Sequence, residues 1–539
     1  MKGFTTPRPD DPGVGRRAPA EQAPAPLSAS DSGRSTRGRE LTRGRLLAGN
    51  TALSVAGELV PMAAAVVAIP LLLRGLGTDR FGILSLAWVV IGYFSLFDLG
   101  VGNALTKLVA SRLGEGREAE IPRLVSAALV LMGLLGLAGG VTLAGSAPWL
   151  IERWLKVPTG LQREALACFR LLAVAVPVVV ATSAFRGLLQ AEQRVGLLLS
   201  IRIPVGVLSY AAPIAVLAFT SSLVPVVAAL VVVRCVSLGL YVAACRRVVP
   251  ALRRGGTVSW AETTALVRFG SWMTVTNVLS PLLMMLDRFV IGSIVSVGAV
   301  AYYATPLDIV NYVGVIPGAM VTVLFPAFAT SFAQDRERTA ALYAAGVKLN
   351  LALMFPVALV LVAFAREGLT IWLGGDFARE GAPVIRWIAF GLLLSAVSRV
   401  AFWLVQGVGR PDLPAKFHVL EIVVYVPLLW WSTWSFGIGG AAAAWTGRIA
   451  LDAGLLLFAS GELVPLPRGV RTRLMTTVLS ALAALGLIQL VESVPLRLAA
   501  VSVVVAGFAC LCWRGLLSSE ERAWVRNAVS DVRVTAGLG

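Results

Sequence analysis

Residues Leu46–Arg112 read LLAGNTALSVAGELVPMAAAVVAIPLLLRGLGTDRFGILSLAWVVIGYFSLFDLGVGNALTKLVASR. The stretch contains two apolar segments on either side of the polar break RGLGTDRFG. Each is long enough to cross the ~30 Å hydrocarbon core of a bilayer as a helix. Pro61 interrupts the first segment, and an acidic residue, Asp98, lies inside the second. We therefore predict two membrane-spanning helices here, one carrying a proline and the other a charge.

The composition extends this prediction to the whole chain. Its 539 residues are 57% hydrophobic and only 14% charged, with a mean hydropathy of +0.80, whereas about 25% of the residues of a soluble protein are charged. So much apolar sequence cannot fit in a globular core, and we predict an all-α polytopic membrane protein. About fourteen spans are expected, at residues 48–73, 81–107, 121–148, 165–189, 196–220, 223–245, 262–286, 298–330, 342–364, 383–408, 415–436, 438–460, 472–491 and 494–513.

The basic residues indicate how the chain is oriented. The net charge is +17, and Lys and Arg outside the spans concentrate in the tails and in the alternate loops on the side of the N-terminus. This is the positive-inside pattern, which places both termini in the cytoplasm of a cell (inner or plasma) membrane. The charge thus reflects topology and attraction to anionic lipid headgroups, and nucleic-acid binding is not predicted.

The first spans have a counterpart later in the chain. Leu46–Met62 aligns with Leu266–Leu282, Pro61 falls on Pro281, and the hydropathy that follows also matches. An even number of spans separates the copies, so both have the same orientation. This predicts two six-helix bundles in a parallel repeat, with a cavity between them. Because proline removes a backbone hydrogen bond and kinks a helix, Pro61 and Pro281 are predicted hinges.

The predicted organisation has five parts. They are a basic cytoplasmic tail that is expected to be disordered (1–45), an N-terminal bundle (46–260), a C-terminal bundle (261–465), two additional spans (466–515) and a cytoplasmic tail (516–539). The loops have no room for a soluble domain, which argues against most catalytic architectures. The five cysteines lack metal-ligand spacing, so neither a catalytic residue nor a metal site is predicted.

Short motifs in both halves resemble a known family. NTALSVAGELVPMAAAVVAIPLLLRGLGTDRFG, SLFDLGVGNALTKLVA and LDRFVIGSIVSVGAVAYYAT are similar to segments of polysaccharide transporters. These are the O-antigen and exopolysaccharide flippases of the multidrug/oligosaccharidyl-lipid/polysaccharide exporter superfamily. The resemblance covers about residues 45–515. It implies translocation of a lipid-linked oligosaccharide to the outer leaflet by alternating access, driven by an ion gradient. In agreement, the chain has no GxxxxGK[ST] phosphate loop.

The resemblance also implies partners and a coupling ion. The substrate would be an oligosaccharide on a polyprenyl diphosphate, handled within membrane lipids. A polysaccharide polymerase and glycosyltransferases of the same pathway would be the protein partners. No bound cofactor is expected beyond H⁺ or Na⁺ as coupling ion.

Charged residues inside spans are costly unless they are paired or hydrated, so each is a functional candidate. Glu58 lies one helical turn before Pro61, and Asp98 is followed by two glycines; these acids are the ion-coupling candidates. Arg234 and Arg399 have no partner within their own helices, and Asp308 follows Pro306 deep in its span. We predict that these three line the cavity, where the two guanidinium groups can bind phosphate oxygens in a bidentate manner.

Other intramembrane charges are expected to be structural. Asp287 and Arg288 lie near the predicted outer end of their span and are expected to be interfacial. Arg448 and Asp452 are four residues apart on one helix and are expected to neutralise each other. Interfacial or packing roles are also expected for Arg170, His418 and Glu421.

Three alternatives stay open at this point. The first is a drug or cation antiporter of the same fold, whose cavity should favour acids over arginines. The second is a flippase for a lipid-linked peptidoglycan precursor. The third is a membrane polysaccharide polymerase or glycosyltransferase, against which the short outer loops argue.

Overall fold

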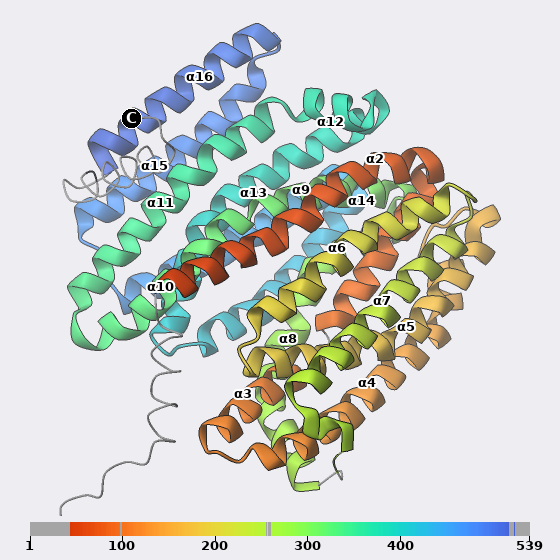
Figure 1. Ribbon diagram of the computed structural model, residues 1–539. Helices are drawn as coiled ribbons and strands as arrows, with labels where there is room; N and C mark the ends of the chain where they lie inside the picture. Colours follow the sequence, from red (N-terminus) through yellow and green to blue (C-terminus); the bar gives the residue numbers. More distant parts are fainter. Residues whose placement is uncertain (1–43, 97–99, 255, 257–259, 517–521, 523–539) are drawn as a thin grey trace, which may run out of the picture. The chain divides into compact units, whose positions relative to one another are not determined.

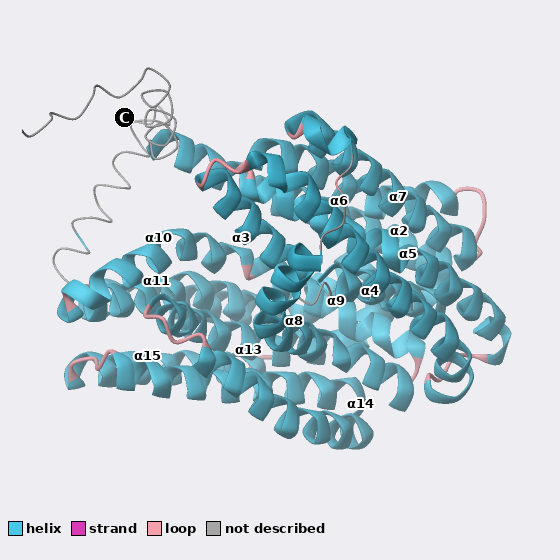
Figure 2. Ribbon diagram, turned by 90° about the horizontal axis from the view of Figure 1, so that it is seen from below, coloured by secondary structure: helices cyan, strands magenta, loops and turns pink. Residues whose placement is uncertain are grey.

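The computed structural model describes residues 44–96, 100–254, 256, 260–516 and 522. These residues form helices joined by short loops, and no strand occurs among them (Figures 1 and 2). Apart from the first turns of α2, the described helices belong to the unit that begins at Ala52. Ten of the described helices are long and apolar enough to cross a membrane. The chain is therefore an all-α, multi-pass membrane protein, as predicted.

The helices of the first half lie over the first six predicted spans. They are α2 (Gly44–Leu96), α3 (Val101–Gly114), α4 (Ile121–Trp149), α5 (Thr159–Ala191), α6 (Val195–Leu217) and α7 (Leu223–Val248). Helix α2 covers the first span and most of the second, and α3 covers the end of the second. Within this half, α5 packs against α3, α4 and α7, and α6 packs against α7.

The second half begins with α8. Two of its helices, α9 and α10, share one predicted span. The helices are α8 (Trp260–Ile294), α9 (Val297–Val313), α10 (Val315–Gln334), α11 (Arg336–Ala363), α12 (Ala365–Leu373), α13 (Gly375–Gly407), α14 (Asp412–Leu463), α15 (Arg468–Leu487) and α16 (Val494–Leu511). Helices α9 and α10 together occupy the predicted span 298–330. The count of fourteen spans and the two-bundle repeat stay predictions.

Two glycines divide the longest helices. Gly77 in α2 has φ 76° and Gly437 in α14 has φ 59°, a backbone region that glycine occupies without the steric cost of a Cβ. Each long helix is thereby split into two apolar segments, at the places where the sequence predicts turns between spans. Pro61 leaves α2 helical, so the sharp change of direction in this helix occurs at Gly77.

Apolar packing joins the helices into two clusters of buried side chains. One cluster includes residues from α2 to α9 with parts of α13 and α14, and the other lies around α11, α13 and the C-terminal helices. Helix α13 packs against α9, α11 and α14, while α15 and α16 lie against α11 (Figure 1). Helix α8 packs against α14 and also against α3 and α4. It therefore connects the two halves of the chain.

Close contacts between the halves occur at both ends of the spans. At the predicted outer end, a Cβ added to Gly82 would lie only 1.8 Å from the Val297 carbonyl oxygen, and the Lys156 backbone N–H donates to the Gly292 carbonyl at 2.9 Å. At the predicted inner end, Arg112 of α3 forms an ion pair with Glu262 of α8 at 3.6 Å. The halves are thus in contact at both ends.

Candidate functional site

A pair of tyrosines from α6 and α9 joins the two halves. The hydroxyl oxygens of Tyr210 on α6 and Tyr312 on α9 lie 3.1 Å apart. The Tyr210 ring packs on Trp88 of α2, with 5.3 Å between the ring centroids. Tyr312 is near the last residue of α9, and the helix breaks at Gly314 before α10 begins. We refer to Tyr210 and Tyr312 as the tyrosine pair.

Glu58 approaches the tyrosine pair from α2. Its carboxylate accepts a hydrogen bond and ion pair from Arg202 of α6, and both side chains are partly exposed. Glu58 also interacts electrostatically with Tyr312. The two helices pack closely here, since a Cβ on Gly206 would lie 2.7 Å from Pro61 Cγ. The predicted coupling acid therefore has an arginine partner within reach of the site.

Asp308 approaches the same pair from α9 itself. It lies one helical turn before Tyr312, and Arg288 of α8 donates to its carboxylate at 2.5 Å. The neighbouring Asp287 is completely buried and accepts from the Tyr303 hydroxyl at 2.6 Å. The interfacial role expected for Asp287 and Arg288 is wrong, because both side chains are buried among α8, α9 and α14. An adjacent pair of charges on one helix gives no sign of these partners, which come from later helices.

The two arginines that were predicted to line the cavity, Arg234 and Arg399, lie near the residues around the tyrosine pair. Arg234 of α7 donates to the Ser209 hydroxyl at 3.1 Å and interacts electrostatically with Tyr210. Its Nε has no hydrogen-bond partner among the described residues. Arg399 of α13 lies beside the break after α9, where a Cβ on Gly314 would be 3.5 Å from its Nη2. A guanidinium is favoured there by the partial negative charge at a helix C-terminus.

Four of the predicted site residues therefore gather around the tyrosine pair, namely Glu58, Arg234, Asp308 and Arg399. Asp98 lies outside the described residues, as does the side chain of Pro281. The sequence analysis missed Arg202, Tyr210 and Tyr312. Arg202 lies within the predicted span 196–220, so the cost of burying a charge could have identified it. The lone tyrosines carry no such signal.

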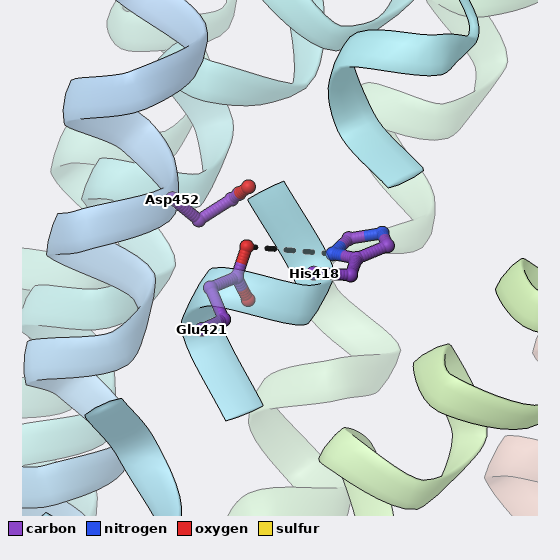
Figure 3. A group of neighbouring side chains, drawn as sticks. All are labelled: His418, Glu421 and Asp452. Atoms are coloured by element: carbon purple, nitrogen blue, oxygen red, sulfur yellow. Dashed lines mark hydrogen bonds and ion pairs between the residues drawn. The ribbon is translucent and has the colours of Figure 1, made fainter. Parts of the chain in front are cut away.

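A second polar cluster lies on the two segments of α14. Figure 3 shows His418 and Glu421 on one segment, with Asp452 pointing toward them from the other. Glu421 is completely buried and accepts from Arg448 at 3.1 Å. Arg448 thus forms its ion pair with Glu421, and its interaction with Asp452, the partner expected from the sequence, is electrostatic only. Glu421 was expected to be a solvated or paired acid at the inner end of its span; it is paired, and its complete burial excludes the solvated form.

Comparisons with known families place this fold among membrane transporters. Residues 47–332 match the model of the family described as "Polysaccharide biosynthesis protein", and residues 273–431 match the MatE family model. A Shigella flexneri protein named "Putative O-antigen transporter" is 26% identical over 412 residues, which are 76% of this chain and 96% of that protein.

Solved structures with the same fold include a flippase and a drug transporter. "Lipid II flippase MurJ, inward closed conformation" has a TM-score of 0.68 at 11% identity, over 87% of this chain and 99% of that one. "Inward-facing conformation of a multidrug resistance MATE family transporter of the MOP superfamily" has a TM-score of 0.65 at 15% identity, over 78% of this chain and 98% of that one. These similarities show the shared fold.

Proposed function

Since this chain belongs to the polysaccharide biosynthesis protein family, we propose that it is a flippase for a polyprenyl diphosphate-linked oligosaccharide. It moves this lipid from the cytoplasmic to the outer leaflet of the cell membrane during synthesis of a surface polysaccharide. The name of the Shigella flexneri relative and the lipid flippase among the solved structures support this class of substrate.

The observation that carries the proposal is the excess of arginine around the tyrosine pair. Glu58 pairs with Arg202, and Asp308 pairs with Arg288. These pairs leave Arg234 and Arg399 without a carboxylate partner among the described residues. Two such guanidinium groups suit an anionic diphosphate, whose oxygens accept bidentate hydrogen bonds.

The position of these groups also suits a lipid-linked substrate. Arg202, with 46% of its side chain exposed, and Glu58, with 39%, lie within apolar helices. Charged groups within such helices are tolerated beside water but not beside lipid tails, which favours a hydrated path for the headgroup. The polyprenyl tail stays in lipid while the headgroup crosses, and Trp88 offers an aromatic surface to a sugar ring.

Transport then proceeds by alternating access of the site to the two leaflets. In this proposal the halves move about Pro61 and Pro281, and H⁺ or Na⁺ binding at Glu58 or Asp98 supplies the driving force. The termini lie in the cytoplasm, where glycosyltransferases supply the substrate, and a polymerase uses it on the outer side. The arginine excess argues against a cationic drug as substrate, since like charges in the site would repel it.

Complementation tests this function directly. The protein is expressed in a strain that lacks its own flippase for lipid-linked oligosaccharide, and both surface polysaccharide and accumulated lipid-linked intermediates are measured. We expect surface polysaccharide to return and the intermediates to decline. The double variant R234A/R399A should lose at least about tenfold in activity, equivalent to about 1.4 kcal/mol.

The control variant is R170A, because Arg170 is an exposed arginine of α5. It should retain activity. Restoration of a strain that lacks its lipid-linked peptidoglycan precursor flippase, without restoration of surface polysaccharide, would reassign the substrate. Accumulated intermediates despite membrane insertion of the protein in both strains would refute the flippase proposal.

A further inference from the structure

The cluster on α14 combines an imidazole, two carboxylates and a guanidinium. His418 Nδ1 lies 3.3 Å from Glu421 Oε1, and Arg448 Nη1 lies 3.1 Å from Glu421 Oε2. Ligand atoms of His418, Glu421 and Asp452 all lie within 4.8 Å of one another (Figure 3). Both oxygens of Glu421 are thus engaged while a second carboxylate lies beside it.

The charges of this cluster do not balance by themselves. Glu421 and Asp452 supply two negative charges, and Arg448 supplies one positive charge. Glu421 is 0% exposed and the Arg448 side chain 8%, whereas Asp452 is partly buried, so water can compensate the remaining negative charge only in part. An uncompensated buried charge costs several kcal/mol. One more positive charge would therefore stabilise the cluster.

A proton fits this role better than a divalent metal ion. A divalent ion would reverse the sign of the imbalance and lie against the guanidinium of Arg448. Imidazole is the side chain whose ordinary pKa lies closest to neutral pH, and 17% of the His418 side chain is exposed, in contrast to Glu421. It lies two turns from the start of α14. The imidazole therefore offers a route by which a proton from water can reach the buried carboxylate of Glu421.

Unpartnered polar groups extend from the cluster toward the tyrosine pair. Tyr425 lies one turn beyond Glu421, and its ring is 5.5 Å from the Arg448 guanidinium carbon. The Tyr425 hydroxyl and Arg448 Nε have no hydrogen-bond partner among the described residues, although both side chains are more than nine-tenths buried. Both Tyr425 and Arg448 interact electrostatically with Asp287 of α8.

The surroundings of the cluster come from four helices. On α14 the charged or titratable neighbours are Arg448 and Tyr425. Helix α8 contributes Asp287, and α9 contributes Tyr303, which donates to that carboxylate. Helix α13 contributes the Trp387 carbonyl, which accepts a hydroxyl hydrogen bond from α14. These contacts connect the cluster to the helices that carry Arg288 and Asp308.

We propose that His418, Glu421 and Asp452 form a proton-binding site that couples a proton gradient to the movement of the two halves. The proposal rests on the proposed function, and it adds a coupling site in the second half to those considered at Glu58 and Asp98. One proton enters at His418 from water on one side of the membrane, is held among the three side chains, and is released to water on the other side after the halves have moved. No other bond is formed or broken.

Arg448 transmits the change in protonation. When the proton leaves, both carboxylates are charged and compete for the guanidinium, because Asp452 lies four residues after Arg448 on the same helix face. Displacement of Arg448 toward Asp452 alters its contact with Tyr425 and its attraction to Asp287. The Asp287–Arg288–Asp308 network then responds beside the tyrosine pair.

The single histidine of the chain makes proton binding measurable. The full-length protein in lipid nanodiscs, labelled with ¹⁵N and ¹³C only in histidine, should give one imidazole signal that titrates with pH. In E421Q and D452N the titration midpoint should fall by about one pH unit, because a neighbouring negative charge is lost. D412N is the matched control: Asp412 is an exposed carboxylate at the start of the same helix, and its loss should leave the midpoint nearly unchanged.

Cations distinguish the occupants of the site. At constant ionic strength and neutral pH, neither Na⁺ in place of choline nor added Zn²⁺ should change the imidazole signal. A change with Na⁺ or with Zn²⁺ would assign the site to that cation and overturn the proposal. An imidazole that does not titrate, or whose midpoint is the same in E421Q, D452N and wild type, would also overturn it.

A conformational measurement tests the coupling. Spin labels replace Arg74 and Arg379, two exposed residues at the predicted outer end, in a background without the native cysteines. The distance distribution should differ between mildly acidic and mildly alkaline pH, and the difference should disappear in H418N and E421Q. A distribution independent of pH would refute the coupling. If pH moves the labels but complementation fails, the flippase proposal is at fault and the proton site stands.

Discussion

Charged side chains in the middle of this protein fall into two environments. Glu58 and Arg202 form a partly exposed pair, whereas Glu421 and Arg448 form a pair that is almost completely buried. An exposed pair can exchange its partner for water or a ligand at little cost. A buried pair cannot, because each charge would be left in a medium of low dielectric constant. The partly exposed environment therefore suits substrate binding, and the buried environment suits a site that changes its protonation.

This difference predicts that loss of Arg448 is costly. R448M leaves Glu421 and Asp452 without their guanidinium, and we expect the free energy of unfolding to fall by about 3–5 kcal/mol. R202M removes a partly exposed charge and should cost roughly 1 kcal/mol or less. Thermal unfolding in detergent provides the comparison. Equal losses in the two variants would contradict the assigned burial.

At the scale of elements, glycines allow helices to approach one another where a side chain would not fit. Gly82 on α2 lies against the backbone at the start of α9, and the nearest atom to an added Cβ would be a carbonyl oxygen. Backbone cannot move aside as a flexible side chain can. This contact therefore helps to hold the predicted outer end of the two halves together.

We expect G82A to separate the halves at that end. The added methyl group conflicts with the Val297 carbonyl, and overpacking of this kind costs about 1–3 kcal/mol. A cysteine at Ala299, which is 7% exposed, should then react faster with a membrane-impermeant maleimide. G133A is the control, since nothing lies within 4 Å of a Cβ at Gly133. An unchanged labelling rate in G82A would show that this contact does not hold the end closed.

At the scale of the whole molecule, an ion pair joins the halves at the other end. Arg112 of α3 contacts Glu262 of α8 at 3.6 Å and Glu120 at 2.9 Å. Hydrogen bonds from Ser111 and Arg117 hold the pKa of nearby Glu115 below its usual range. The Glu115 carboxylate therefore stays charged at neutral pH. Salt should weaken the ion pairs of Arg112.

Charge reversal tests this contact. R112E should weaken the closure of the predicted inner end by about 1 kcal/mol, and R112E/E262R should recover part of it. Spin labels at the exposed positions Glu118, in the connection between α3 and α4, and Thr264 on α8 report the separation at this end. High salt should reproduce the effect of R112E in the wild type. A double variant that remains as open as the single one would exclude the Arg112–Glu262 pair as its cause.

The sequence by itself determined the class of fold and identified the charged residues that lie inside apolar segments. Apolar segments of spanning length must become helices in a bilayer, because lipid offers no partner for an unpaired backbone group. The same cost identified Glu58, Arg234, Asp308 and Arg399 as residues that need a polar environment. These inferences depend only on local composition and on the nature of the solvent.

Only the tertiary structure decided which of these charges meet. Arg448 is four residues from Asp452, yet it binds Glu421, which lies 27 residues earlier and returns beside it after the turn at Gly437. Likewise, Tyr210 and Tyr312 come from different halves of the chain. Partners of this kind depend on how helices pack and rotate against one another, which the pattern along a single helix does not specify. The site around the tyrosine pair and the buried cluster of α14 are therefore products of packing.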